Sequence, residues 1–118
     1  MAYGLYLVLD QDQWYRDDYS ATNKLTGTIY TNKSLTKKKD LSGYTITIRL
    51  YKGNRWGDHF GKTASIVSAT GGTFEYAVNE GEMPPPSIYN VKVELSKTGD
   101  RESTLNRQEL FVLEGPTA

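Results

Sequence analysis

The chain has 118 residues, an apolar fraction of 37%, nine tyrosines, no cysteine, a single histidine and a formal net charge of zero. This length predicts one domain, residues 1–118, that is large enough to bury an apolar core. The absence of cysteine excludes disulfides and thiolate metal sites, and a single histidine excludes a histidine-rich metal cluster. We therefore expect no cofactor and no metal.

The first ten residues, Met1 to Asp10, carry neither a basic segment nor a long apolar run. A signal peptide has both features, and a membrane-spanning helix needs about 20 consecutive apolar residues. We therefore expect a protein that is not secreted through a signal peptide and does not span a membrane. It is expected to act in the cytoplasm or in an assembly that is built there.

Short segments with alternating apolar and polar residues recur along the chain, and a period of two is typical of strands with one buried face. The first half of the chain predicts three such strands, at Tyr3–Asp10, Lys24–Thr31 and Tyr44–Lys52. Between the first two, the polar and aromatic segment Gln11–Ser20 predicts an extended loop or a short strand. Between the second and third, Asn32–Lys39 is a basic loop.

The second half predicts four more strands, at Lys62–Ser68, around Phe74–Val78, at Ile88–Ser96 and at about Thr104–Leu113. The pair Gly71-Gly72 provides the positive φ of a tight hairpin turn before the second of these strands. The prolines Pro84–Pro86 exclude a central strand before the third, because proline has no N–H to donate. The tail from about Glu114 is expected to be loose.

About seven short strands with turns every 8–12 residues are typical of an antiparallel β-sandwich of the immunoglobulin type. Tyr89 lies near the start of the sixth predicted strand, where the tyrosine corner of such domains is found. We therefore expect an all-β, immunoglobulin-like sandwich without the cysteine pair of antibody domains. Its predicted core contains Tyr44, Ile46, Ile48, Leu50, Phe74, Tyr76, Val91, Val93 and Leu95.

Charge is spread unevenly along the neutral chain. Residues 1–22 hold four acidic and one basic residue, residues 23–55 hold one acidic and eight basic, and residues 56–118 hold nine acidic and five basic. Segments of opposite sign allow pairing with other copies or with complementary neighbours. Lys37, Lys38 and Lys39 are therefore interface candidates, with a solvated loop as the alternative. The basic segment also permits nucleic-acid contact, but zero net charge argues against that partner.

Five aromatic residues fall in polar or turn-rich segments and are further interface candidates: Trp14, Tyr15, Tyr19, Trp56 and Phe60. Tryptophan and tyrosine are enriched at protein interfaces. Aromatic rings also form stacking platforms for sugars. The aromatic pattern thus favours either an assembly protein or a carbohydrate-binding module, and some of these side chains are expected to cover the ends of the core.

The sequence offers little support for catalytic or metal-binding residues. The aspartates within Asp10–Asp18 offer oxygens for Ca²⁺, but the segment lacks the glycine and the closing glutamate of an EF-hand loop. His59 directly follows Asp58, and adjacent residues on a strand point to opposite faces, which disfavours a catalytic pair. Glutamates between Glu75 and Glu82 would need a cleft to act as a glycosidase pair. We expect no enzyme.

Five elements follow one another between Lys39 and Leu113 in a recognisable order. They are Asp40-Leu41-Ser42-Gly43 with the strand Tyr44–Leu50, then Gly72–Tyr76, Glu80–Pro86, Tyr89–Leu95 and Glu109–Leu113. In this order they resemble the N-terminal immunoglobulin-like domain of the phage baseplate upper protein family. The resemblance covers about two-thirds of the chain.

The resemblance implies a non-enzymatic structural subunit of a tailed-phage virion, with no catalytic residues. It favours a place in the tail or baseplate, and capsid decoration is the first alternative. The implied partners are other virion proteins, including further copies of the chain, and the implied location is the virion, assembled in the host cytoplasm. A glycan partner belongs to the carbohydrate-binding alternative.

Overall fold

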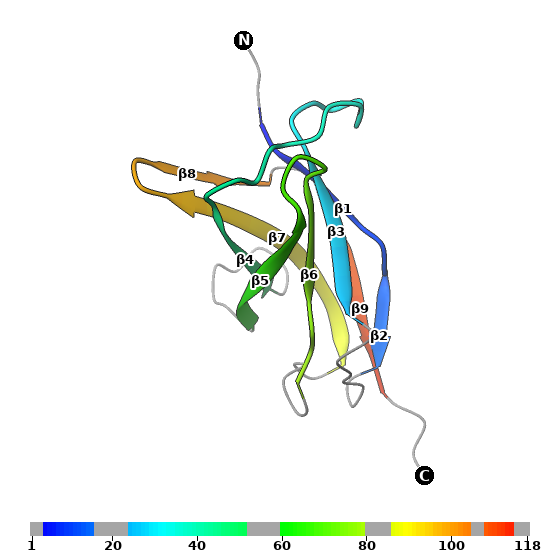
Figure 1. Ribbon diagram of the computed structural model, residues 1–118. Coiled ribbons are helices and arrows are strands. Elements are labelled where there is room, and N and C mark those ends of the chain that lie inside the picture. Colours follow the sequence, from blue (N-terminus) through cyan, green and yellow to red (C-terminus); the bar gives the residue numbers. More distant parts are fainter. Residues whose placement is uncertain (1–3, 16–23, 52–59, 80–85, 105–107, 115–118) are drawn as a thin grey trace.

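The computed structural model describes residues 4–15, 24–51, 60–79, 86–104 and 108–114. Within these ranges the chain is all β, which confirms the predicted class, and no helix long and apolar enough to cross a membrane occurs there. The strands (Figure 1) are β1 (Tyr6–Leu9), β2 (Gln13–Tyr15), β3 (Leu25–Tyr30), β4 (Thr45–Tyr51), β5 (Phe60–Ser68), β6 (Thr73–Tyr76), β7 (Ser87–Lys97), β8 (Asp100–Ser103) and β9 (Glu109–Leu113).

The nine strands form one curled, mixed sheet (Figure 1). Its order is β1-β3-β6-β5-β4-β7-β9-β2, and β8 pairs with β7. The long strand β5 joins two parts of this sheet, because Phe60–Ala64 pairs with β4 and Ser65–Ser68 pairs with β6. A register shift between Ile66 and Ser68 accompanies the change of partner.

One pairing departs from the predicted antiparallel arrangement, because β2 runs parallel to β9. The link between β1 and β2 is only three residues long and carries the chain onward instead of reversing it. Strand β2 therefore continues in the direction of β1 and pairs with β9 instead of returning beside β1. The alternative of a short strand within Gln11–Ser20 is confirmed by β2.

The sheet curls until its two ends approach each other. Strands β1 and β2 end the sheet path at opposite sides, yet they are consecutive in the chain. Leu5 forms a parallel bridge with Thr104, and the Leu9 N–H donates to Gln108 Oε1 at 3.0 Å. These contacts join β1 to the segment between β8 and β9.

The core lies inside the curl and is filled by alternate residues of the strands, as a period of two requires. On β4 and β7 the facing pairs Ile46–Leu95 and Ile48–Val93 are buried. The predicted core is confirmed except at Tyr76, which is half-buried and packs against the core from its margin. Further buried side chains come from Leu5, Leu7, Leu25, Ile29, Leu41, Val78, Tyr89, Leu110 and Val112.

The β5–β6 hairpin depends on Gly72, one of the two glycines predicted to form a turn. Gly72 has φ +68°, a conformation that favours glycine. A Cβ on this residue would lie 2.7 Å from Ile29 O and 2.9 Å from Lys39 O. The Gly72 carbonyl also accepts from the Ile29 N–H at 2.8 Å. The turn thus packs directly against the backbone at Ile29 and Lys39, with no room for a side chain at Gly72.

The last predicted strand, about Thr104–Leu113, is observed only in its second half, as β9, and β8 lies before it as a strand that was not predicted. The Val93 N–H donates to Thr104 Oγ1 at 3.1 Å, and the Val91 N–H donates to Gln108 O at 2.8 Å. Between these bonds β7 advances by two residues while the opposing chain advances by four. A continuous ladder of hydrogen bonds requires equal numbers of residues on the two strands, so pairing is interrupted here. The alternation of apolar and polar residues does not predict this interruption.

Candidate functional site

The basic loop is a well-organised turn, and Asn32–Lys38 is called the lysine loop from here on. Asn32 Oδ1 accepts from the N–H groups of Thr36 and Lys37, both at 3.0 Å. Asn32 Nδ2 donates to Ser34 Oγ at 2.9 Å and to Thr36 Oγ1 at 2.6 Å. A bridge between Tyr30 and Lys38 closes its base. The loop therefore has a defined shape that can present its side chains.

The surface of the lysine loop combines positive charge with one apolar side chain. Lys33, Lys37 and Lys38 are exposed. Leu35 lies among them with 42% of its surface exposed, and its φ of +58° is left-handed. Leucine seldom adopts this conformation because its Cβ crowds the backbone. Sequence reasoning identified two of these lysines and missed Leu35, whose backbone conformation leaves no sequence signal.

Lys39 differs from its two neighbours, although all three were predicted as one basic group. Its Nζ lies 3.2 Å from Glu102 Oε2 on β8 and 5.1 Å from the centre of the Tyr44 ring. The side chain is only 21% exposed. Lys39 therefore holds the base of the lysine loop against the β7–β8 hairpin, while Lys37 and Lys38 face solvent.

Tyr44 is the centre of this polar contact. Its hydroxyl donates to Asp100 Oδ2 at 2.5 Å and lies 3.3 Å from Glu102 Oε2. Lys97 Nζ stands 4.3 Å from the centre of the Tyr44 ring, within the range of cation–π attraction. Sequence reasoning placed Tyr44 in the apolar core and missed this cluster, because Asp100 and Glu102 lie more than fifty residues from Tyr44 along the chain.

The cluster shifts two pKa values in the same direction. The hydrogen bond to Asp100 and burial both raise the pKa of the Tyr44 phenol, and the nearby Lys39 opposes them only in part. Burial alone would lower the pKa of Lys39, but hydrogen bonds and charge attraction from Glu102 and Tyr44 outweigh it, and the pKa is raised. Both protonated forms are therefore favoured by folding. This arrangement therefore stabilises the contact between Tyr44, Lys39 and the β7–β8 hairpin.

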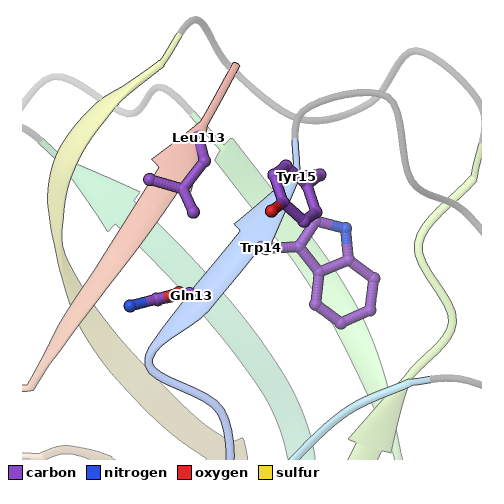
Figure 2. Close-up of a pocket in the computed structure, with 4 residues that line it drawn as sticks. All are labelled: Gln13, Trp14, Tyr15 and Leu113. Atoms are coloured by element: carbon purple, nitrogen blue, oxygen red, sulfur yellow. The ribbon is translucent and has the colours of Figure 1, made fainter. Parts of the chain in front are cut away.

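Trp14 and Tyr15 lie on β2, beside β9 (Figure 2). Trp14 is half-buried and packs on the core, whereas Tyr15 is 42% exposed. Both residues, with Gln13 and Leu113, line a pocket of about 190 Å³. Small-molecule sites usually measure about 300–1,000 Å³. This pocket is therefore of a size to receive a side chain or the edge of one sugar ring.

An exposed apolar patch extends from this pocket along the outer face of the sheet. Ile88 on β7 and Phe111 on β9 face each other directly and are 50% and 37% exposed. Tyr15 and Leu113 are paired one step further along. These four residues form what is called the apolar patch from here on. Alternation predicts outward positions for Ile88 and Phe111, but we did not identify their pairing from the sequence.

Three acidic residues lie on or next to the strand segments that form the apolar patch. Glu109 precedes Phe111 by two positions and so projects from the same face of β9. Asp12 lies beside this strand, since its carbonyl accepts from the Phe111 N–H at 2.9 Å, and Glu114 directly follows Leu113. All three carboxylates belong to exposed residues. The described acidic residues near the patch therefore have the opposite charge to the exposed lysines of the lysine loop.

Other candidates are distributed as follows. Tyr19 and Trp56 lie outside the described residues, and only the backbone of Phe60 is described, paired with Leu50. His59, Asp58 and the aspartates at 17 and 18 also lie outside. Among the described residues no group of three or more metal-ligating side chains occurs. Asp10 accepts a hydrogen bond from the Thr26 hydroxyl at 2.5 Å, and Glu75 pairs with Lys24 at 3.0 Å.

Comparisons with protein-family models, with curated proteins and with solved structures found no match for this chain.

Proposed function

We propose that the chain is a non-enzymatic structural subunit of a tailed-phage virion, most directly of the tail or baseplate, that acts by docking on neighbouring subunits. The observation that carries the docking role is the apolar patch, in which Ile88 and Phe111 stand exposed on rigid paired strands. Exposed aromatic and aliphatic side chains on a sheet face favour a protein partner. The family resemblance of residues 39–113 supplies the virion context. The apolar patch would equally support the alternative role of a capsid decoration protein.

We further propose that the curled sheet is a variant of the immunoglobulin-like sandwich. The order β1-β3-β6-β5 corresponds to the strand order A-B-E-D, and β4-β7-β9 corresponds to C-F-G. Strand β5 would then serve both halves, with its first part beside β4 and its second beside β6. A strand-by-strand correspondence of this kind supports the fold that the spacing of turns predicts.

Carbohydrate binding is the second candidate, and the pocket at Trp14 and Tyr15 favours it. A sugar platform needs an aromatic ring that lies open to solvent, and Tyr15 meets that need better than the half-buried Trp14. The small volume of the pocket limits such a ligand to the edge of one ring. A glycan would therefore bind weakly, with few contacts.

A paired measurement separates these two functions. The variant Tyr15→Ser with Phe111→Ser removes the exposed rings, and Val67→Ser on β5, which is 58% exposed, serves as its control. If the patch is a docking surface, the double variant folds but is not incorporated into particles, the control is incorporated, and the wild type binds no glycan on an array. Glycan binding by the wild type that is lost in the double variant, with normal incorporation, would support the second candidate instead.

A further inference from the structure

The lysine loop and the apolar patch have complementary chemistry. The loop presents one exposed apolar side chain, Leu35, among three exposed ammonium groups. The patch presents exposed Ile88, Phe111 and Tyr15, with exposed Glu109 on the same face of β9 and exposed Asp12 and Glu114 next to the ends of its strands. An apolar centre with a charged border of opposite sign is the arrangement that two docking surfaces need.

The two surfaces lie at opposite ends of the molecule. In Figure 1 the segment between β3 and β4 is at the top, and the paired strands β2 and β9 are at the bottom right. One chain therefore cannot bring its own loop onto its own patch. A contact between the two surfaces needs two copies, and each copy keeps one surface of each kind open. Such a contact is head-to-tail and can be repeated.

The conformation of Leu35 gives an independent reason to assign a role to the loop tip. A left-handed leucine costs stability that glycine at the same position would not. Leu35 also leaves 42% of its surface exposed, so a substantial part of its side chain has no packing partner within the chain. Unfavourable backbone conformations of this kind concentrate at binding and active sites. A contact outside the chain would account for the leucine.

We propose that the lysine loop of one copy docks on the apolar patch of a second copy, with Leu35 against Ile88 and Phe111. Lys33, Lys37 and Lys38 would then face Asp12, Glu109 and Glu114. This contact deepens the proposed assembly role and rests on it for its biological meaning. Two described cations of the same outer face already have partners, since Arg49 pairs with Glu94 at 3.6 Å and Lys92 donates to Thr104 O at 3.2 Å.

Because the chain has no cysteine, introduced thiols can map the contact directly. Ser34→Cys places a thiol in the lysine loop, and Gln13→Cys places one beside the patch. Equal amounts of the two purified chains are mixed under mild oxidation at low salt. The proposal predicts that the loop–patch disulfide dimer forms in clear excess over either like-with-like dimer. The matched control pairs Ser34→Cys with Thr63→Cys, an exposed position on β5, and is expected to give only background dimer.

Two further changes test the chemistry of the contact. Leu35→Gly in the loop-thiol chain should reduce the dimer several-fold while its urea unfolding midpoint is unchanged or higher. Changing Lys33, Lys37 and Lys38 together to Glu should reduce it to background, whereas changing them to Arg should not. Salt at about 1 M, where the screening length is about 3 Å, should also weaken the dimer.

Three outcomes would overturn the proposal: a control dimer as abundant as the loop–patch dimer, an excess of loop–loop dimer, or no effect of Leu35→Gly. The result is distinguishable from a failure of the proposed function. Loss of this contact in a protein still found in particles would remove the second copy as the partner and leave the virion role. A confirmed contact in a protein that is absent from particles would keep the second copy as the partner and remove the virion role.

Discussion

Gln11 and Gln108 take the place of strand partners where β1 leaves β3. Gln11 Nε2 donates to Lys24 O, and its Oε1 accepts from the Thr26 N–H, both at 3.0 Å. One side-chain amide thus satisfies a backbone donor on β3 and the backbone acceptor of the residue just before it. On the other side of β1, Gln108 Oε1 accepts from the Leu9 N–H. Through these side-chain bonds, the Leu9 N–H, the Thr26 N–H and the Lys24 carbonyl keep hydrogen-bond partners where β1 ends.

Gln11→Met should therefore destabilise the fold, although the substitution changes the size of the side chain little. Methionine keeps the shape of the side chain but leaves the Thr26 N–H without its acceptor, and an unsatisfied, partly buried donor costs about 1–3 kcal/mol. Gln13→Met, at an exposed position on the same segment, should change stability by less than about 0.5 kcal/mol. Urea unfolding of both variants measures the difference, and equal effects would show that the Gln11 bonds contribute little.

Ile48→Ala tests the assignment of the buried face of β4. Ile48 is 1% exposed and faces Val93 across the strands, so its truncation should lower the free energy of unfolding by about 2–5 kcal/mol. Thr45→Ala, at an exposed position on the same strand, is the control. A loss under about 0.5 kcal/mol at Ile48 would mean that this face is not the core.

At the scale of the elements, the β5–β6 hairpin and the β7–β8 hairpin both turn through glycines with positive φ. Gly72 has φ +68° and Gly99 has φ +79°. Their surroundings differ, since a Cβ at Gly72 would approach two carbonyl oxygens, whereas a Cβ at Gly99 would meet nothing within 4 Å. The pair separates the cost of backbone conformation from the cost of a steric clash.

Gly99→Ala should lower the free energy of unfolding by about 1–2 kcal/mol, the cost of a left-handed residue with a side chain. Gly72→Ala should lower it by clearly more, because the backbone oxygens of Ile29 and Lys39 must also move. The two variants are compared by urea unfolding under the same conditions. If both lose the same amount, the β5–β6 turn is not held as closely against β3 as described.

The β7–β8 hairpin should respond to alkaline pH through Tyr44 and Lys39. Both pKa values are raised on folding, so their contribution to stability is fully present below the ordinary values near pH 10 and is lost as the pH rises through the folded values. The stability difference between the wild type and Tyr44→Phe should therefore be constant near neutral pH and shrink above about pH 10. Unfolding midpoints at several pH values measure it, and a difference that grows with pH would contradict the assignment.

Element positions could be predicted from alternation wherever one face is buried. Strands β3, β4 and β7 follow this rule, and the predicted ranges differ from the observed ones by only one or two residues. Strand β8 was missed because its four residues are all polar and pair with β7 beyond the core. The parallel partner of β2 was missed because parallel or antiparallel direction depends on the path of the chain, which period two does not encode.

At the scale of the whole molecule, the sequence indicated the basic segment and the exposed aromatics but not how they combine. Tyr15 joins a patch with Ile88 and Phe111, which come from strands more than seventy residues away. Lys39 separates from Lys37 and Lys38 because Glu102 approaches it from a distant segment and the Tyr44 ring lies beside it. Candidate residues could be named from their type, whereas the surfaces they form required the curl of the sheet.

The lysine loop and the apolar patch lie at opposite ends of the molecule (Figure 1). Exposed lysines belong to the first surface, and exposed Glu109 lies on the same face of β9 as the second. A neutral subunit of this kind can be added to an assembly repeatedly without accumulating charge.

The virion role is tested most directly by locating the protein in particles. Purified tailed-phage particles from a host that expresses the chain are imaged, and density of its size is matched at the tail, the baseplate and the capsid. The account predicts ordered copies at the tail or baseplate, with contacts made through the apolar patch. Particles that contain no copy, while the protein accumulates free in the cell, would contradict it.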